Sequence, residues 1–71
     1  MRLQTVKSRM LKAAGYDETQ RTLHVVFRTG HTYRYKKVPS DEYDALMKAE
    51  SKGDYMHKNI IGHYEYDRID K

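Results

Sequence analysis

The sequence predicts an α+β fold in which a three-stranded antiparallel β-meander is packed on one face by two C-terminal α-helices. Three observations support this prediction. Two runs of strand-forming residues flank a glycine-containing turn at residues 23–38. A polar turn at residues 17–22 joins this hairpin to an earlier extended segment, and apolar residues recur at helical spacing within residues 40–64.

The 71 residues are enough for one small domain and leave no room for a second. We expect a single domain over residues 1–71, with frayed ends at residues 1–4 and 69–71. The lack of cysteine excludes disulfides and the usual zinc knuckles. The apolar runs are short and the amino terminus lacks the apolar core of a signal peptide. We therefore expect a soluble cytoplasmic protein with no membrane partner.

The first strand of the meander is predicted at residues 10–16, after a short extended piece around Val6. Ala13 and Ala14 favour helices, so a helix over this segment is an alternative. Residues 17–22 are rich in side chains that hydrogen-bond their own backbone, which favours a turn. This turn returns the chain antiparallel into the strand that begins at Leu23.

Two registers compete for the hairpin at residues 23–38, because one residue of slip turns every side chain of a strand to the other face. In the first, residues 28–30 form a three-residue loop, a type I turn closed by Gly30 in the left-handed region. This register pairs Phe27 with His31, Val25 with Tyr33 and Leu23 with Tyr35. In the second, a two-residue loop at residues 29–30 puts both tyrosines on the charged face. We favour the first because it gathers the large apolar side chains, where burying each contributes about 1.5 to 3 kcal/mol.

Two helices are predicted after the hairpin. Pro39 cannot donate to a strand ladder, Ser40 is a good N-cap, and the acidic residues 41 and 42 suit the positive end of a helix dipole. We expect this helix to end at Gly53, and Asp54 to cap a second one. The apolar positions are Tyr43, Leu46 and Met47 in the first helix, and Met56, Ile60 and Tyr64 in the second. The tail from residue 65 to residue 71 is irregular or a short edge strand.

A series of short motifs follows in a specific order along nearly the whole chain. They are Val6-Lys7-Ser8, Gly15-Tyr16-Asp17, Leu23-x-Val25-x-Phe27-x-x-Gly30, Tyr33-Arg34-Tyr35, Val38-Pro39, Tyr43-x-x-Leu46, Ala49-x-Ser51-x-Gly53-x-Tyr55, Asn59-Ile60 and Tyr64-x-Tyr66-x-Arg68. In these motifs the chain resembles the KTSC domain, a family named from the carboxyl end of some lysyl-tRNA synthetases. The family also includes free-standing small bacterial or phage proteins. The chain departs from the family pattern at Arg9, Met56 and Gly62-His63. The resemblance implies RNA binding as a suggestion, and it implies no catalytic residue.

Seven tyrosines, with no tryptophan, offer either core rings or stacking surfaces for unpaired bases. The tyrosines expected in the core, with hydroxyl groups that reach its rim, are Tyr16, Tyr33, Tyr35 and Tyr43. The pattern constrains Tyr55, Tyr64 and Tyr66 less. Of these, Tyr64 and Tyr66 are the candidates for stacking on a base.

The polar face of the predicted sheet carries basic side chains. The favoured register pairs His24 with Arg34 and Thr22 with Lys36, with Arg28 and Lys37 nearby. A basic cluster without interleaved acids, in a chain of net charge +4, favours an anionic partner. An ordinary solvated sheet face is the alternative interpretation. The predicted nucleic-acid-binding residues are Arg28, Arg34, Lys36, Lys37, His24 and Tyr66.

No motif in the sequence indicates catalysis. The four histidines lack the spacing of a metal site, and the chain has no P-loop, no GxGxxG and no GxSxG turn. We therefore expect a non-enzymatic, monomeric binding module with no metal and no cofactor. RNA is the first predicted partner, and an acidic protein surface of the transcription or translation machinery is the alternative.

Overall fold

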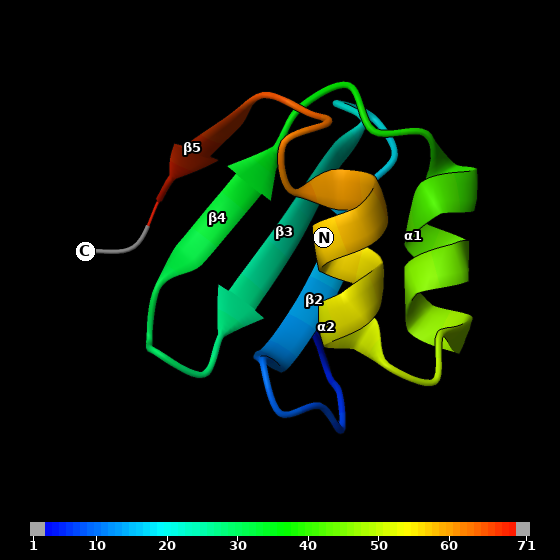
Figure 1. The fold of residues 1–71 in the computed structure, drawn as a ribbon. Coiled ribbons are helices and arrows are strands. Elements are labelled where there is room, and N and C mark those ends of the chain that lie inside the picture. The colour runs from blue at the N-terminus through cyan, green and yellow to red at the C-terminus, as the bar shows by residue number, and fades with distance from the viewer. Residues whose placement is uncertain (1–2, 70–71) are drawn as a thin grey trace.

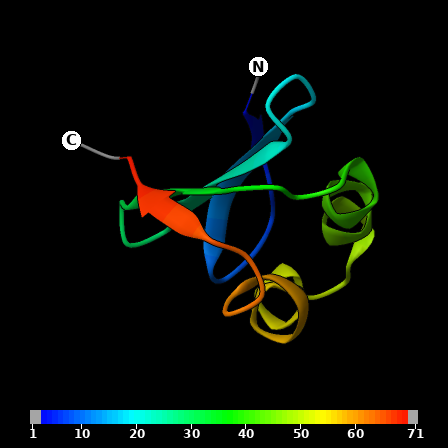
Figure 2. The ribbon, with the colours of Figure 1, turned by 90° about the horizontal axis from the view of Figure 1, so that it is seen from above.

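The computed structural model describes residues 3–69 of the chain. Within this range, five strands form one antiparallel sheet in chain order, and the helical segments lie on one of its faces (Figures 1 and 2). The strands are β1 (Gln4–Thr5), β2 (Leu11–Asp17), β3 (Thr22–Phe27), β4 (Thr32–Tyr35) and β5 (Tyr66–Arg68). The helical segments are α1 (Ser40–Lys48), α2 (Lys52–Tyr55) and the π-helical turn η1 (Met56–Ile60), which continues α2.

The predicted three-stranded meander with two C-terminal helices is wrong. The sheet has five strands, because β1 pairs with β2 and β5 pairs with β4. The helices are not C-terminal, since β5 follows them and closes the far edge of the sheet. Gln4, which was expected among the frayed residues 1–4, pairs with Ala14. At the other end, the Ile69 backbone N–H donates to the Thr32 carbonyl. Residues 1, 2, 70 and 71 lie outside the described residues.

The register favoured for the central hairpin is confirmed. Val25 lies opposite Tyr33 and Leu23 opposite Tyr35, and the Phe27 N–H donates to the His31 carbonyl at 2.9 Å. The loop is residues 28–30, and Gly30 has a φ of +100°, in the region that only glycine adopts without strain. Side chains alternate along these strands, so the residues between the core positions, such as His24 and Arg34, point to the face without helices.

The helices begin and end at other residues than the sequence predicts. Pro39, not Ser40, is the N-cap of α1, and the helix stops at Lys48 because the backbone is extended at Ala49. Ser51 caps α2, since its hydroxyl accepts from the Asp54 N–H at 3.3 Å. Gly53 and Asp54, predicted as the end of one helix and the cap of the next, therefore both lie inside α2.

The core lies between the sheet and the helical layer. The largest fully buried side chains among the described residues are Leu11, Leu23, Val25, Val38, Leu46, Met56 and Ile60. The α2 helix packs closely on Met10, the residue before β2, because a Cβ built on Gly53 would lie 3.3 Å from the Cβ of Met10. This close packing holds the helical layer over β2 and β3 and leaves β4 and β5 beyond its edge (Figure 1).

Candidate nucleic-acid interface

The face of the sheet opposite the helices holds three of the predicted binding residues, and an acid lies among them. Arg34 on β4 is paired with Asp67 on β5, and Arg34 Nη2 lies 2.9 Å from Asp67 Oδ2. Lys36 Nζ lies 3.2 Å from the same carboxylate oxygen. Hydrogen bonds from Arg34 and Lys36 lower the pKa of Asp67. The expected basic cluster without acids is therefore partly neutralised by Asp67. The sequence allowed a short edge strand in this tail but did not place Asp67 beside the basic residues.

His24 belongs to this same face and is partly buried. It lies opposite Arg34, as predicted, and its Nε2 is 3.1 Å from the Thr22 hydroxyl. Burial, together with the charge of Arg34, lowers the pKa of His24. The predicted pair of Thr22 with Lys36 does not form, since the β3–β4 ladder ends at Leu23 and the Lys36 N–H donates to the Glu65 carbonyl instead. His24 therefore stays neutral to a lower pH than an ordinary histidine.

The other three predicted residues lie elsewhere. Lys37 is exposed after β4 with a φ of +55°. Arg28 lies at the hairpin loop, and its Nε donates to the Ser8 carbonyl at 2.6 Å. Tyr66 lies on β5 opposite Tyr35, so its ring is on the helical side of the sheet. The structure thus brings Arg28 and Tyr66 to one groove, apart from Arg34, Lys36 and His24.

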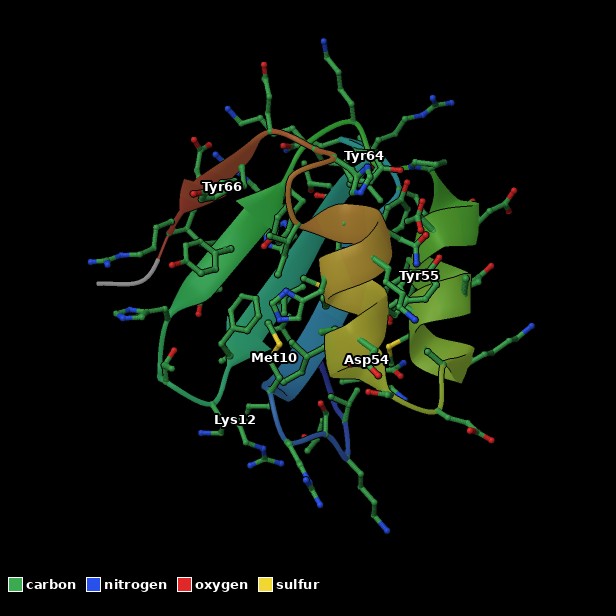
Figure 3. The ribbon with its side chains drawn as sticks, viewed as in Figure 1. Met10, Lys12, Asp54, Tyr55, Tyr64 and Tyr66 are labelled. Atoms are coloured by element: carbon green, nitrogen blue, oxygen red, sulfur yellow. The ribbon has the colours of Figure 1, made fainter. Side chains whose placement is uncertain are left out.

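We call this site the aromatic groove. It is an open depression of about 610 Å³ beside the helical layer. It is lined by Arg9, Met10, Phe27, Arg28, Thr29, His31, Tyr33, Tyr35, Ile61, Gly62 and Tyr66. Figure 3 shows Met10 beside α2 and Tyr66 on β5, on opposite sides of this region. The groove exists because the helices cover β2 and β3 but not β4 and β5, the two strands at the other edge of the sheet (Figure 2).

The rings of the groove form one connected cluster. The ring of Tyr33 makes edge contacts with Phe27, at a centroid distance of 5.3 Å, and with Tyr66, at 5.4 Å. Tyr66 is also 5.6 Å from Tyr35. Burial raises the pKa of Tyr35 to about 12, with smaller contributions from Tyr33 and Tyr66. Tyr66 is 59% exposed, whereas Phe27 is 7% and Tyr35 4% exposed. The inner rings of the cluster are therefore buried, and Tyr66 is its exposed ring.

The charges around the groove all have one sign. Arg9 and Arg28 are exposed residues of its lining, and none of the described residues that line it is acidic. Flat rings bind planar apolar groups and guanidinium groups bind phosphates or carboxylates, so the arrangement suits a ligand that has both a planar and an anionic part. It offers no activated nucleophile. Within residues 3–69, no three side chains of histidine, aspartate or glutamate lie together as a metal site would require.

The sequence predicted Arg28 and Tyr66 but missed Arg9, Met10 and His31 as members of a site. The favoured register already placed His31 opposite Phe27, on the same face as Tyr33, which was the available indication. Tyr33 was expected in the core and is only partly buried, because the helices do not extend over it. Tyr64, the other predicted stacking ring, donates from its hydroxyl to Glu42 at 2.9 Å and is held against α1.

Comparison with known proteins identifies the family. The model of the KTSC domain matches residues 7–64. The chain belongs to the KTSC domain family. A KTSC domain protein from Yersinia pestis, known from a crystal structure, superposes with a TM-score of 0.95 at 33% identity, covering 97% of each chain. The five-stranded sheet with its helices on one face is therefore shared with that KTSC protein.

Two kinds of relative contain a matching KTSC sequence. An uncharacterized protein from Stutzerimonas stutzeri is 38% identical over 71 residues, which is 99% of this chain and 100% of the relative. A lysine–tRNA ligase from a Nostoc species is 41% identical over 59 residues, which is 83% of this chain. This KTSC chain spans about 10% of the length of that ligase. No helix of residues 3–69 is long and apolar enough to span a bilayer.

Proposed function

We propose that this KTSC domain is a non-enzymatic RNA-binding module and that RNA contacts the aromatic groove. The observation that carries the proposal is one groove that is lined by both an exposed tyrosine and two arginines, with no acid among the described lining residues. Stacking on aromatic rings and contact of arginine with phosphate are the two interactions with which proteins hold single-stranded RNA. Relatives of the chain include lysine–tRNA ligases, whose name gives tRNA as a substrate, which adds support for RNA.

The first test is a titration of the purified domain with labelled RNA, followed by fluorescence anisotropy. We expect micromolar affinity that weakens steeply between about 50 mM and about 200 mM salt, because each phosphate contact releases condensed counterions. An RNA set that contains a single strand, a duplex and a hairpin samples the main RNA shapes. The absence of detectable binding to all three at the lower salt concentration would contradict the proposal.

A second test decides which face of the sheet binds RNA. Asp67→Asn removes the carboxylate that engages Arg34 and Lys36 on the face without helices. Asp44→Asn, at an exposed position of α1, is a matched control with the same change in net charge. If RNA binds the aromatic groove, we expect the two variants to gain the same small affinity. A clearly larger gain for Asp67→Asn would move the binding site to Arg34, Lys36 and the face without helices.

One observation favours a second candidate function, a protein-interaction module. β5 is an edge strand, and its outer edge offers backbone groups to which a partner strand pairs. A pull-down with and without nuclease treatment separates the two candidates. A protein that stays bound after nuclease treatment favours this candidate, whereas its loss after nuclease favours RNA. Under either candidate, we expect a monomeric, cytoplasmic protein.

A further inference from the structure

We infer that the aromatic groove takes a segment of single-stranded RNA, with one unpaired base on Tyr66 and phosphates further along the strand at Arg9 and Arg28. This inference rests on the proposed function and names its substrate class. The alternative within RNA is the duplex, whose bases are already stacked on one another and cannot reach a protein ring. The inference therefore predicts a preference for single-stranded over duplex RNA. It also assigns base stacking to Tyr66 and phosphate contacts to Arg9 and Arg28.

The floor of the groove is apolar and already formed without ligand. Phe27 and Tyr35 are almost fully buried, and the ring of Tyr33 rests edge-on against Phe27. Met10 and Ile61 close the side toward the helices. The volume of about 610 Å³ lies within the range of sites for small ligands, roughly 300 to 1,000 Å³. A base entering this space displaces water from apolar side chains, with no rearrangement of the core.

Tyr66 is the ring that the structure leaves available for stacking. Its contact with Tyr33 has an interplanar angle of 88°, so the two rings meet edge to face and do not stack in parallel. The residue is 59% exposed, and its ring also lies 5.6 Å from that of Tyr35. Tyr64 is a poorer candidate, because its hydroxyl bond to Glu42 fixes it against α1. A base stacked on Tyr66 would cover the most exposed aromatic side chain among the described residues.

The arginines fix where the phosphates lie. The Nε of Arg28 donates to the Ser8 carbonyl, which orients the guanidinium at the rim of the groove. A guanidinium has five N–H donors, so the Nη groups of Arg28 remain for a phosphate. Arg9 is exposed on the segment between β1 and β2 and lines the same groove. A carboxylate-bearing peptide would also suit these charges, but the partly exposed ring of Tyr66 in the same groove favours a nucleic acid.

The experiment compares a labelled single-stranded 12-mer with the same strand paired to its complement, in five proteins. They are the wild type, Tyr66→Ala, Tyr66→Phe, Arg9→Ala/Arg28→Ala and the control Lys48→Ala/Lys58→Ala, whose lysines are exposed and outside the groove. We expect tighter binding of the single strand. Tyr66→Ala should weaken it about 5- to 150-fold, the effect of one lost stacking contact. Tyr66→Phe should stay within about twofold of the wild type, because the ring remains.

The two double variants remove the same charge, so they separate specific phosphate contacts from net charge. For Arg9→Ala/Arg28→Ala, we expect the slope of log K against log salt to become shallower by about 1.4, two contacts at about 0.7 each. The control should keep the wild-type slope. Thermal unfolding of each variant, followed by circular dichroism, shows whether it is folded. Should Tyr66→Ala fail to fold, the two arginine variants and the duplex comparison still decide the question.

Each failure has a distinct meaning. No binding of either RNA by the wild type would overturn both the proposed function and this inference. Equal binding of duplex and single strand, with Tyr66→Ala as tight as the wild type, would overturn the inference and leave RNA binding in place. Equal loss in the arginine variant and its lysine control would overturn the assignment of Arg9 and Arg28 as phosphate contacts.

Discussion

We expect removal of the Glu42 carboxylate to weaken the attachment of α1 to α2. Glu42 lies in the first turn of α1, and its carboxylate accepts hydrogen bonds from two tyrosines beyond that helix. The Tyr55 hydroxyl, from α2, donates to Oε1, and the Tyr64 hydroxyl donates to Oε2 at 2.9 Å. Figure 3 shows Tyr55 between α2 and α1. One side chain therefore joins α1 to α2 and to the segment that leads into β5.

The size of the effect follows from these two bonds. Hydrogen bonds to charged groups contribute about 1.5 to 3 kcal/mol each when buried, and all three side chains are only partly buried, so we expect about 2 kcal/mol for Glu42→Ala. Glu42→Gln should cost about half as much, because an amide offers one oxygen acceptor in place of two. In a domain of this size, about 2 kcal/mol lowers Tm by about 8 to 16 °C.

The assay combines unfolding with a tyrosine titration. The hydrogen bond to Glu42, followed by burial, raises the pKa of Tyr55 to about 12 from its ordinary value of 10, and burial with the same carboxylate raises that of Tyr64. Between pH 10 and 12 the folded protein keeps a proton that the unfolded chain loses, so stability falls as pH rises through this window. In Glu42→Ala, tyrosinate absorbance should appear at lower pH.

The matched controls are Tyr55→Phe and Tyr64→Phe, which remove one donor each and keep the ring. In a double-mutant cycle, each should show coupling with Glu42→Ala of at least about 0.5 kcal/mol. Additive effects, or an alkaline titration that Glu42→Ala leaves unchanged, would refute the claim that this carboxylate holds the helices together.

Three further predictions concern the turn, the second helix and acid stability. Gly30→Ala should destabilise the domain by about 1 kcal/mol in urea unfolding, because its φ is +100° although no atom obstructs an added Cβ; an unchanged midpoint would contradict this. Ser51→Ala should cost about 1 kcal/mol in the same measurement, because its hydroxyl caps the Asp54 N–H, and Ser51→Asn should recover most of the loss. Burial and the charge of Arg34 lower the pKa of His24 below 6.5, so the unfolded state binds the proton first and stability should fall as pH decreases from 6.5. His24→Gln should flatten this acid dependence in a pH series of Tm values.

The central hairpin could be predicted because local chemistry fixes it. Gly30 sets the loop, and a slip of one residue would have moved Tyr33 and Tyr35 onto the charged face. Both tyrosines lie on the helical side, and Tyr35 is buried, as the favoured register required. The outcome depended on one glycine and an alternating pattern four to six residues long, both of which are visible in the sequence.

The edges of the sheet could not be predicted with the same certainty. β1 has two residues and β5 three, and such short segments carry no recognisable alternation of apolar and polar residues. Their strand conformation comes from pairing with a neighbour, and the partners Arg34 and Asp67 are 33 positions apart in the chain. The prediction did allow a short edge strand in the tail, but it did not place Asp67 beside the basic residues.

The start of the second helix was also predicted at the wrong residue. Ser51 and Asp54 are both good N-caps, and the sequence alone does not rank them. The structure selects Ser51, since its hydroxyl reaches the Asp54 N–H and Gly53 then lies where the helix approaches Met10. The π-helical turn that follows adds one residue per turn, which no spacing rule for α-helices anticipates.

The pairing of β5 and the aromatic groove were both left out of the prediction for one reason. Strands lie about 4.8 Å apart, so five of them span about 19 Å between their outer axes, close to the width that two helices about 10 Å apart can cover. Here α1 contacts α2 and β2 instead of lying over the centre of the sheet, which shifts the pair toward β1. The added β5 widens the sheet on the side that the helices leave free, and it places Tyr66 there. The strand that neutralises Arg34 on one face therefore also supplies the exposed ring on the other, which is why the favoured binding surface moves from the basic face to the aromatic groove.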